Sequence, residues 1–352
     1  MRRLLLLILL ALLGSLVPSA TAAPKPAPQG ERQHGTFSAP GLVSRAFALY
    51  VPSSVAGKPH KKVPLLVYLH GCNQNADDAA VGSRLEALAE EKGLLVLFPQ
   101  QTRTTGSTYP LADGNGSGCW NWFHPDHQTR EAGEPATLAA MTRDVMSRFA
   151  VDADRVWLAG VSAGADMATI LAATHPDLYA AVAPIAGCAY RSCSDVAGTG
   201  AYAAMGERAR VVPTLVIQGS ADMVNNAAMG ATAVSQWVGT NDRADDGAAN
   251  GSVPAAPTSV TTHPAVQGTA PGDPCLGNSR LPCAGGVLGL TSYPYTVSRH
   301  HGADGRSAVE VVVIHGANHA YTGGDPRGTF VDPVGPSMGH LMLDFFAAHP
   351  LR

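Results

Sequence analysis

The sequence predicts an α/β fold in which helices cover both faces of a mainly parallel β-sheet. Short apolar segments, each typical of a buried strand, alternate along the chain with amphipathic segments of helical spacing. A serine between two glycines stands at one of the strand-to-helix junctions. The chain has 352 residues, of which 45% are hydrophobic and 14% are charged, so it can form one large core.

The alternation can be followed element by element. Seven segments are predicted to be strands: AFALYV (46–51), PLLVYLH (64–70), LLVLFP (94–99), RVWLAG (155–160), AAVAPIAG (180–187), PTLVIQG (213–219) and VEVVVIHG (309–316). Helical patterns lie between or after them: RLEALAEEKG (84–93), PATLAAMTRDVMSRFA (135–150), the run 163–175, and MGHLMLDFFAAHP (338–350). Strands that follow intervening helices favour parallel pairing.

The first 23 residues, MRRLLLLILLALLGSLVPSATAA, have the pattern of a cleaved signal peptide. Two arginines precede an apolar core, and small residues end the segment at Ala20-Thr21-Ala22. The alternative is an uncleaved membrane anchor, although the apolar run is shorter than the ~20 residues that a spanning helix needs. Residues 24–35 are predicted to be a disordered leader, and residues 36–352 a single domain of a secreted, extracellular protein.

One segment of this domain departs from the alternation. Residues 239–285 have little periodicity and many Gly, Ala, Pro, Ser and Thr residues, so we expect a long loop insertion rather than a second domain. The insertion is either a surface loop without a functional role or a lid over the site. We prefer the surface loop, because composition alone gives no evidence that a segment lies over a pocket.

The chain contains an even number of cysteines, and export to an oxidising compartment makes disulfides the default. Six cysteines allow 15 pairings, and their spacing does not choose among these. Our hypothesis pairs neighbours in the sequence, and the alternative is a free catalytic thiol. The proposed disulfides are Cys72–Cys119, Cys188–Cys193 and Cys275–Cys283.

The serine at the junction is the strongest candidate for a nucleophile. Ser162 lies in the G-x-S-x-G segment 160–164, after an apolar run at 155–159 and before the helical run 163–175. This context predicts a sharp turn that strains the serine backbone and exposes its Oγ. The alternative is a glycine-rich turn whose serine only caps the helix.

A nucleophilic serine needs a base to take its proton and a carboxylate to orient that base. In such a sheet, the acid and then the histidine are expected after later strands. One predicted strand leads into Asp222 and the last one leads into His319, so we predict a triad of these residues with Ser162. The alternatives are Asp222 as a turn residue and His315 as the base. We prefer His319, because it lies in the loop beyond the strand.

Acyl transfer also needs backbone donors for a developing oxyanion. The N–H of Ala163, which follows the nucleophile, is one candidate, and the N–H of Cys72, in the loop after an early strand, is the other. A disulfide at Cys72 would brace this loop. Trp120 and Trp122 lie in the segment CWNWFHPDHQ and are candidates either for core packing or for the wall of a substrate pocket.

Several segments closely resemble the secreted polyhydroxybutyrate-depolymerase-like esterases, a group of α/β-hydrolases that is similar to feruloyl and acetylxylan esterases. They are LLVYLHGCNQNADD, LVLFPQQ, CWNWFHPDHQTREAGEPATLAAMT, RVWLAGVSAGADMATILAATHPDLYAAVAPIAG and FVDPVGPSMGHLMLDFF. The likeness extends from about Phe37 to the C-terminus, apart from the long loop. It implies the α/β-hydrolase fold and a serine esterase with Ser162 as nucleophile, Asp222 as acid and His319 as base.

Two departures from the family bear on the substrate. The family histidine is commonly followed by Ala-Trp, whereas Ala320-Tyr321 follow His319 here, so Tyr321 is a candidate wall of the pocket. Dedicated depolymerases of this type carry a linker and a substrate-binding domain after the catalytic one, and this sequence ends at FFAAHPLR. Oligomeric or soluble esters are therefore expected substrates.

We expect a secreted serine esterase that hydrolyses aliphatic hydroxyacid polyesters or oligomers through an acyl-enzyme. A feruloyl or acetylxylan esterase acting on plant polysaccharide is the alternative, and a non-catalytic binding protein is a remote one. The net charge of −3 does not favour a nucleic-acid partner. Without a dinucleotide-binding or P-loop motif, or paired metal-ligand spacing, we expect no cofactor and no metal. We further expect a monomer without membrane contact after signal cleavage.

Overall fold

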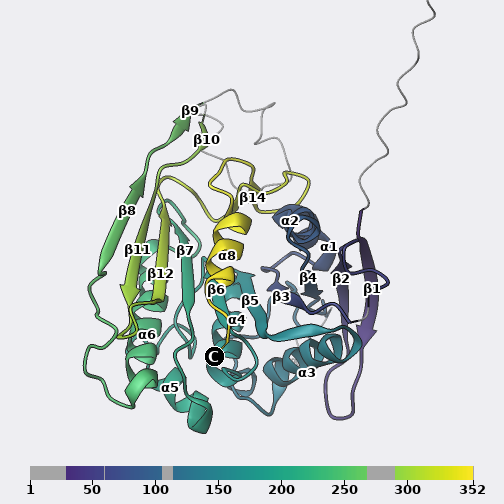
Figure 1. Ribbon diagram of the computed structural model, residues 1–352, viewed down its shortest axis with the longest axis horizontal. Coiled ribbons are helices and arrows are strands. Elements are labelled where there is room, and N and C mark those ends of the chain that lie inside the picture. The colour runs from purple at the N-terminus through teal and green to yellow at the C-terminus, as the bar shows by residue number, and fades with distance from the viewer. Residues whose placement is uncertain (1–28, 59, 105–113, 268–289, 352) are drawn as a thin grey trace, which may run out of the picture.

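The computed structural model describes residues 29–58, 60–104, 114–267 and 290–351, and its centre is a ten-stranded β-sheet (Figure 1). The strands from β4 to β12 in the spatial order pair in parallel, and antiparallel strands complete both edges. The predicted α/β fold with a mainly parallel sheet is confirmed. In spatial order the strands are β1 (Glu31–Phe37), β2 (Arg45–Val51), β4 (Leu95–Pro99), β3 (Val63–Leu69), β5 (Val151–Val161), β6 (Ala181–Ile185), β7 (Thr214–Gly219), β12 (Ser307–Ile314), β11 (Tyr295–His301) and β8 (Ser259–His263).

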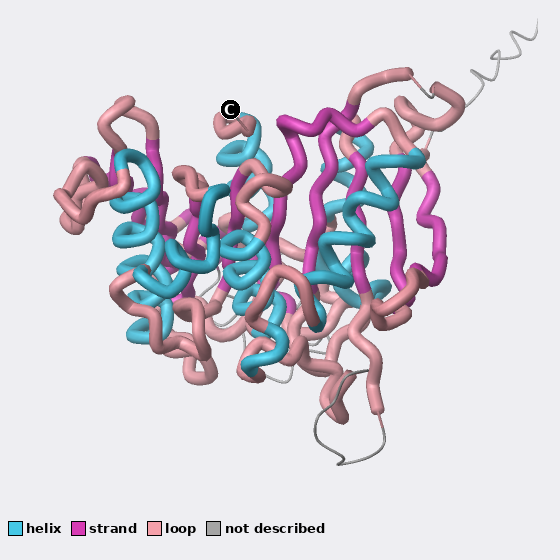
Figure 2. Tube along the Cα trace, turned by 90° about the horizontal axis from the view of Figure 1, so that it is seen from below, coloured by secondary structure: helices cyan, strands magenta, loops and turns pink. Residues whose placement is uncertain are grey.

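Helices cover both faces of the sheet, as Figure 2 shows from a second direction. Two buried apolar clusters divide the helices between these faces. One face carries α1 (Ala76–Ser83), α2 (Leu85–Lys92) and α8 (Met338–Ala347). The other carries α3 (Gly133–Arg148), α4 (Ala163–Thr174), α5 (Thr199–Met205) and α6 (Ala227–Asp246). The short elements are η1 (Pro125–His127), η2 (Gly206–Arg208), the pair β9 (Val266–Gln267) and β10 (Leu290–Ser292), and the pair β13 (Tyr321–Thr322) and β14 (Val331–Asp332).

The central strands are apolar on both faces because each face packs against helices. In β3, Leu66 and Tyr68 belong to the cluster under α1, α2 and α8, whereas Leu65 and Val67 belong to the cluster on the opposite face. Successive side chains of a strand point to opposite faces, so a strand buried on both sides is a continuous apolar run. All seven predicted strands are present for this reason.

The predicted leader is wrong over residues 31–35, because the folded chain already begins with β1. This strand pairs with β2 along its whole length. Its polar side chains contact the helices: Arg32 donates hydrogen bonds to Glu86 at 2.6 Å and to Asp77 at 3.0 Å. Polar composition predicted disorder here, whereas an edge strand needs few apolar residues. The predicted signal peptide, residues 1–23, lies outside the described residues.

The predicted loop over residues 239–285 is wrong over 239–246, 259–263 and 266–267, whereas 247–258 form a loop as predicted. Helix α6 extends to Asp246 and contains Gly239, where a side chain has no room because a Cβ would lie 2.4 Å from the carbonyl oxygen of Ala197. Strand β8 then forms the edge of the sheet, and its exposed, polar residues conceal the apolar pattern of a strand. Residues 268–285 lie outside the described residues.

Two of the three predicted disulfides are present. Cys72–Cys119 and Cys188–Cys193 have S–S distances of 2.01 and 1.97 Å. The third pair, Cys275–Cys283, lies outside the described residues. Within the described ranges, no helix has the length and apolar character needed to cross a membrane.

Candidate active site

Ser162 occupies a sharp turn between β5 and α4. Its backbone has φ 55° and ψ −126°, a conformation that costs energy for a residue with a Cβ. The flanking glycines are required by close backbone contacts, since a Cβ on Gly160 would lie 2.3 Å from Gly164 O and one on Gly164 would lie 2.2 Å from Leu69 O. The Ser162 side chain makes no capping hydrogen bond to α4, so the alternative role as a helix cap is not observed.

Asp222 and His319 meet beyond the ends of two adjacent parallel strands, β7 and β12. Asp222 Oδ2 lies 2.8 Å from His319 Nδ1, and the two residues are 4% and 8% exposed. The other carboxylate oxygen, Oδ1, accepts the N–H groups of Val224 and Asn225 at 2.8 and 2.9 Å. Asp222 therefore both forms a turn and orients the histidine. With the proton on Nδ1, Nε2 of His319 is available as a base.

The competing histidine lies elsewhere. His315 Nε2 is 2.7 Å from the hydroxyl of Thr296 on the neighbouring strand. Of the two histidines proposed as the base, His319 is the one paired with the carboxylate of Asp222.

A cavity of about 170 Å³ lies beside these groups and is lined by Ser162 and His319 at one end. Its walls come from β3, α1 and the segment around β13 and β14, and they include Tyr68, Ser83 and Tyr321. Tyr321 thus lies where the sequence predicted a pocket wall. Phe330, also on the wall, has φ 56°, a strained value for a bulky side chain.

The two predicted tryptophans do not line this cavity. Trp120 is fully buried in the apolar cluster on the opposite face of the sheet, and its Nε1 donates to the carbonyl of His70 at 3.0 Å. Trp122 is partly buried against the same cluster. The alternative of core packing therefore describes Trp120, whereas a substrate contact of the partly buried Trp122 stays a prediction. The aromatic composition of the segment did not reveal which side of the sheet it covers.

The loop after β3 carries the first predicted oxyanion donor. Gly71 N–H donates to Gln74 Oε1 at 2.9 Å, and Asn73 N–H donates to Ser117 O at 2.8 Å. The N–H of Cys72 between them has no acceptor among the described residues, nor does the N–H of Ala163 at the start of α4. Cys72 lines the cavity together with Ser162. Both predicted donors are thus free to bind an oxyanion.

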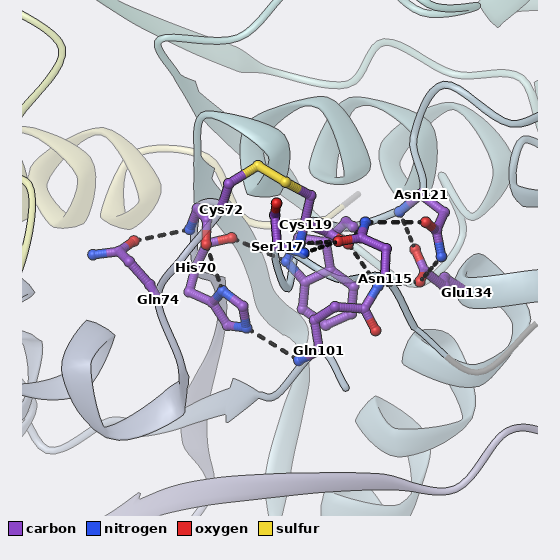
Figure 3. Close-up of a disulfide and its surroundings, with 11 residues drawn as sticks. His70, Cys72, Gln74, Gln101, Asn115, Ser117, Cys119, Asn121 and Glu134 are labelled. Atoms are coloured by element: carbon purple, nitrogen blue, oxygen red, sulfur yellow. Dashed lines mark hydrogen bonds between the residues drawn. A yellow bond between two sulfur atoms is a disulfide. The ribbon is translucent and has the colours of Figure 1, made fainter. Parts of the chain in front are cut away.

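A buried assembly holds this loop, and Figure 3 shows it around the Cys72–Cys119 disulfide. His70 lies within 2.8 Å of Gly71 O through Nδ1 and accepts the N–H of Gln101 at 3.1 Å through Nε2. Burial lowers the pKa of His70 to about 4. The ring is therefore neutral at ordinary pH, which is the state that one donated and one accepted hydrogen bond require.

Glu134 anchors the far side of the assembly. It is 1% exposed and accepts hydrogen bonds from the backbone and side chain of Asn121, at 2.8 and 3.0 Å, and one from Gln101. Arg45, also buried, lies 3.4 Å away and balances its charge. A buried carboxylate is tolerated only when it is paired and hydrogen-bonded in this way.

Sequence reasoning assigned no role to Glu134 or Gln74. The only signal for Glu134 in the sequence was its place in the GEPA segment, and in the structure it lies in the first turn of α3. Gln74 joins the oxyanion loop to the opposite cavity wall, because it accepts Gly71 N–H and donates to Thr329 O at 2.9 Å. Its partner is 255 residues away, so no local pattern could have indicated it.

One further acid lies close to Ser162 along α4. Asp166 is buried and its Oδ1 accepts the N–H of Cys188 at 2.8 Å. Burial raises the pKa of this carboxyl to about 7. No group of three or more metal-ligating side chains occurs among the described residues.

A comparison with known families gives one match. The sequence model of the family described as Esterase PHB depolymerase matches residues 45–249 of this chain. The matched range contains Ser162, Asp222 and Cys72, whereas His319 lies after it.

Individual relatives are similar over part of their length. Poly(3-hydroxyalkanoate) depolymerase C of Paucimonas lemoignei is 36% identical over 156 residues, which are 44% of this chain and 34% of the relative. Feruloyl esterase B of Neurospora crassa is 31% identical over 142 residues, 40% of this chain and 43% of the relative. The chain thus spans less than half the length of these curated relatives.

Among solved structures, the acetyl xylan esterase from Aspergillus awamori has a similar fold, with a TM-score of 0.62 at 18% identity. The match covers 90% of this chain and 99% of that one. The chain therefore has the α/β-hydrolase fold.

Proposed function

The chain belongs to the Esterase PHB depolymerase family, and from this premise we propose that it is a secreted serine esterase acting on aliphatic hydroxyacid polyesters or their oligomers. The observation that carries the proposal is that a strained serine, a histidine paired with a buried carboxylate, and the free N–H of Cys72 line one cavity, with the free N–H of Ala163 directly after the serine. This is the set of parts that acyl transfer to serine requires.

The proposed reaction has two steps. Ser162 Oγ attacks the ester carbonyl carbon as His319 Nε2 takes its proton, and His319 then returns that proton to the leaving alcohol, which gives an acyl-enzyme. Water, deprotonated by His319, attacks this acyl group and releases the acid and the serine. Asp222 holds Nδ1–H and stabilises the imidazolium formed in each step.

The oxyanion of each tetrahedral intermediate binds the N–H groups of Cys72 and Ala163. These donors are in position before the substrate binds, because the disulfide-linked loop and the turn at Ser162 already fix them. Donors that need no rearrangement stabilise the transition state by several kcal/mol, about 2.7–4 for one oxyanion donor.

The size of the cavity favours a short hydroxyacyl group. A cavity of about 150 Å³ accommodates benzene, so the cavity of about 170 Å³ beside Ser162 accepts a hydroxybutyryl unit. An acetyl group would leave most of this space empty. The similarity to a poly(3-hydroxyalkanoate) depolymerase supports the same substrate class.

A feruloyl or acetylxylan esterase is the second candidate, favoured by the similarity to feruloyl esterase B. This candidate uses the same reaction on esters of a different carboxylic acid, ferulic or acetic acid. For a non-catalytic binding protein, the strained Ser162 and the free N–H groups would have no use.

Secretion is part of the proposal, and the two disulfides support it. Disulfides persist in oxidising compartments and are rare in the cytosol.

The test is product release from 3-hydroxybutyrate oligomers and polymer film, beside methyl ferulate and acetylated xylan, with Ser162→Ala as the blank. We expect wild type to release product from the hydroxybutyrate esters faster than Ser162→Ala does. Preference for ferulate or acetyl esters would instead identify a plant cell-wall esterase, and no release from any substrate would leave the binding protein as the better hypothesis.

A further inference from the structure

We propose that Tyr68 determines substrate specificity: its hydroxyl forms the hydrogen bond that selects an acyl group carrying an oxygen on its third carbon, as in 3-hydroxybutyrate. This inference rests on the proposed esterase function and names a subsite within the same cavity. Tyr68 lies in β3, three residues before Gly71 of the oxyanion loop, and lines the cavity together with Ser162.

The Tyr68 hydroxyl makes no hydrogen bond to another described residue. Tyr68 is 2% exposed, yet its hydroxyl is not among the fully buried atoms without a partner, so it is open to the cavity that Tyr68 lines. Two other buried tyrosines are paired within the protein: the hydroxyl of Tyr179 lies 2.9 Å from that of Thr142, and Tyr190 donates to Gln128 O. The Tyr68 hydroxyl can instead donate a hydrogen bond to a ligand oxygen in the cavity.

The surroundings of Tyr68 keep its hydroxyl a donor. Burial raises the pKa of the phenol well above its ordinary value, and the nearby carboxylate of Asp78 raises it further. The ring is held edge-on by Phe98 and Tyr321, with centroid distances of 6.0 and 6.2 Å. A neutral phenol on a fixed ring is suited to recognise a hydroxyl or ester oxygen.

The other polar side chains of the cavity differ in their access to a ligand. The hydroxyl of Ser83 accepts the N–H of Leu85 at 3.3 Å and keeps its own O–H, and Asn73 lies on the exposed part of the lining. The hydroxyl of Tyr321 is sealed from solvent, and a Cβ on Gly339 would lie 3.2 Å from it. Of the two tyrosines that line the cavity, Tyr68 is therefore the one whose hydroxyl can reach a ligand.

The geometry of the reaction assigns this space to the acyl group. His319 must protonate the leaving alcohol, so the alcohol lies beside His319 and Val224, which is 55% exposed at the mouth. The acyl group then occupies the inner part of the cavity between β3 and α1, where Tyr68 lies. In a polyester, the oxygen on the third carbon of this group is either a free hydroxyl or the next ester oxygen.

The experiment compares methyl 3-hydroxybutyrate with methyl butyrate, which differ only in that oxygen. Wild type is expected to have the higher kcat/KM on methyl 3-hydroxybutyrate. Tyr68→Phe is expected to lower this kcat/KM by about tenfold, the effect of one hydrogen bond, and to change kcat/KM on methyl butyrate by less than about twofold.

Tyr179→Phe is the matched control, because it removes a buried tyrosine hydroxyl on the opposite face of the sheet. It is expected to leave the ratio of the two kcat/KM values unchanged, and thermal unfolding shows that each variant is folded. Three results would overturn the inference: a wild type without preference for the hydroxyester, an equal effect of Tyr68→Phe on both esters, or no effect on either. If wild type matched Ser162→Ala on both esters, the proposed function itself would fail.

Discussion

The two halves of the candidate site are held in different ways. On the oxyanion side, formed by residues 70–74 and their supports at 115–134, a disulfide and a buried polar assembly fix the backbone. On the acid–base side, formed by the loops at 220–225 and 316–321, the Asp222–His319 hydrogen bond, the turn at Asp222 and a few hydrogen bonds between the two loops fix two side chains. Met223, beside the acid, is 91% exposed.

The difference follows from what each half must position. A backbone N–H cannot be moved without moving its peptide group, so an oxyanion donor depends on the rigidity of the whole loop. A histidine side chain can be oriented by a single carboxylate, provided that the carboxylate is itself fixed. The oxyanion side therefore needs many buried partners, and the acid–base side needs few.

The largest expected effect is at Ser162, where the two halves meet. Ser162→Ala is expected to lower kcat by about 10⁶ because no covalent intermediate can form. Steady-state hydrolysis of a 3-hydroxybutyrate ester measures this loss. Near-normal activity of the variant would show that the nucleophile lies elsewhere.

The next effect tests the acid–base side. Asp222→Asn is expected to lower kcat by about 10⁴, because the amide no longer fixes the tautomer of His319. An unfolding measurement on the same variant separates this loss from a loss of the turn at Val224 and Asn225. A variant that is folded and fully active would mean that Asp222 serves only as a turn residue.

A smaller effect is expected on the oxyanion side. The double variant Cys72→Ser, Cys119→Ser is expected to lower kcat by about 10- to 100-fold, with a small change in KM, because a loosened Cys72 N–H still lies near the oxyanion. Cys188→Ser, Cys193→Ser removes a disulfide outside the cavity walls and is the matched control. Equal losses of kcat in the two double variants would contradict a special role for the brace.

The smallest effect concerns stability and a buried acid that belongs to neither half. The folded-state pKa of Asp166 is raised to about 7, so between about pH 4 and pH 7 the carboxyl is ionised in the unfolded chain and neutral in the folded one. The stability of wild type therefore falls as pH rises through this range and no longer changes with this group above pH 7. Asp166→Asn cannot ionise. The free energy of unfolding of the variant relative to wild type is expected to increase by about 3 kcal/mol from pH 5 to pH 8.5, nearly all of it below pH 7. Denaturant unfolding at both pH values measures this difference, and a pH-independent difference would contradict it.

The sequence predicted most of the acid–base side and the central sheet, because both follow local patterns. Asp222 and His319 each come directly after an apolar strand, and parallel strands bring such loops to one edge of the sheet. The sequence predicted which loop carries the oxyanion donor Cys72, but it did not predict the buried residues that hold this loop. Gln74 and Glu134 act through partners distant in the chain, and Trp120 was assigned to the substrate pocket or the core without a way to choose.

The edges of the sheet were the least predictable part of the fold. Strands β1 and β8 are polar and exposed, and their pairing with β2 and β11 rather than their own composition makes them strands. Helix α6 was not predicted, and its second half, rich in small and polar residues, was assigned to the long loop. These contacts are tertiary, so a pattern of hydrophobicity does not contain them.

The most direct test of the account is covalent labelling with a fluorophosphonate, followed by mass spectrometry of the peptides. This reagent phosphonylates a serine only where a base and an oxyanion site act on it together. We expect a single modified peptide, labelled at Ser162, and no label in Ser162→Ala or in wild type unfolded before labelling. A label on another serine, or an active enzyme that takes no label, would contradict the assignment of Ser162 as the nucleophile.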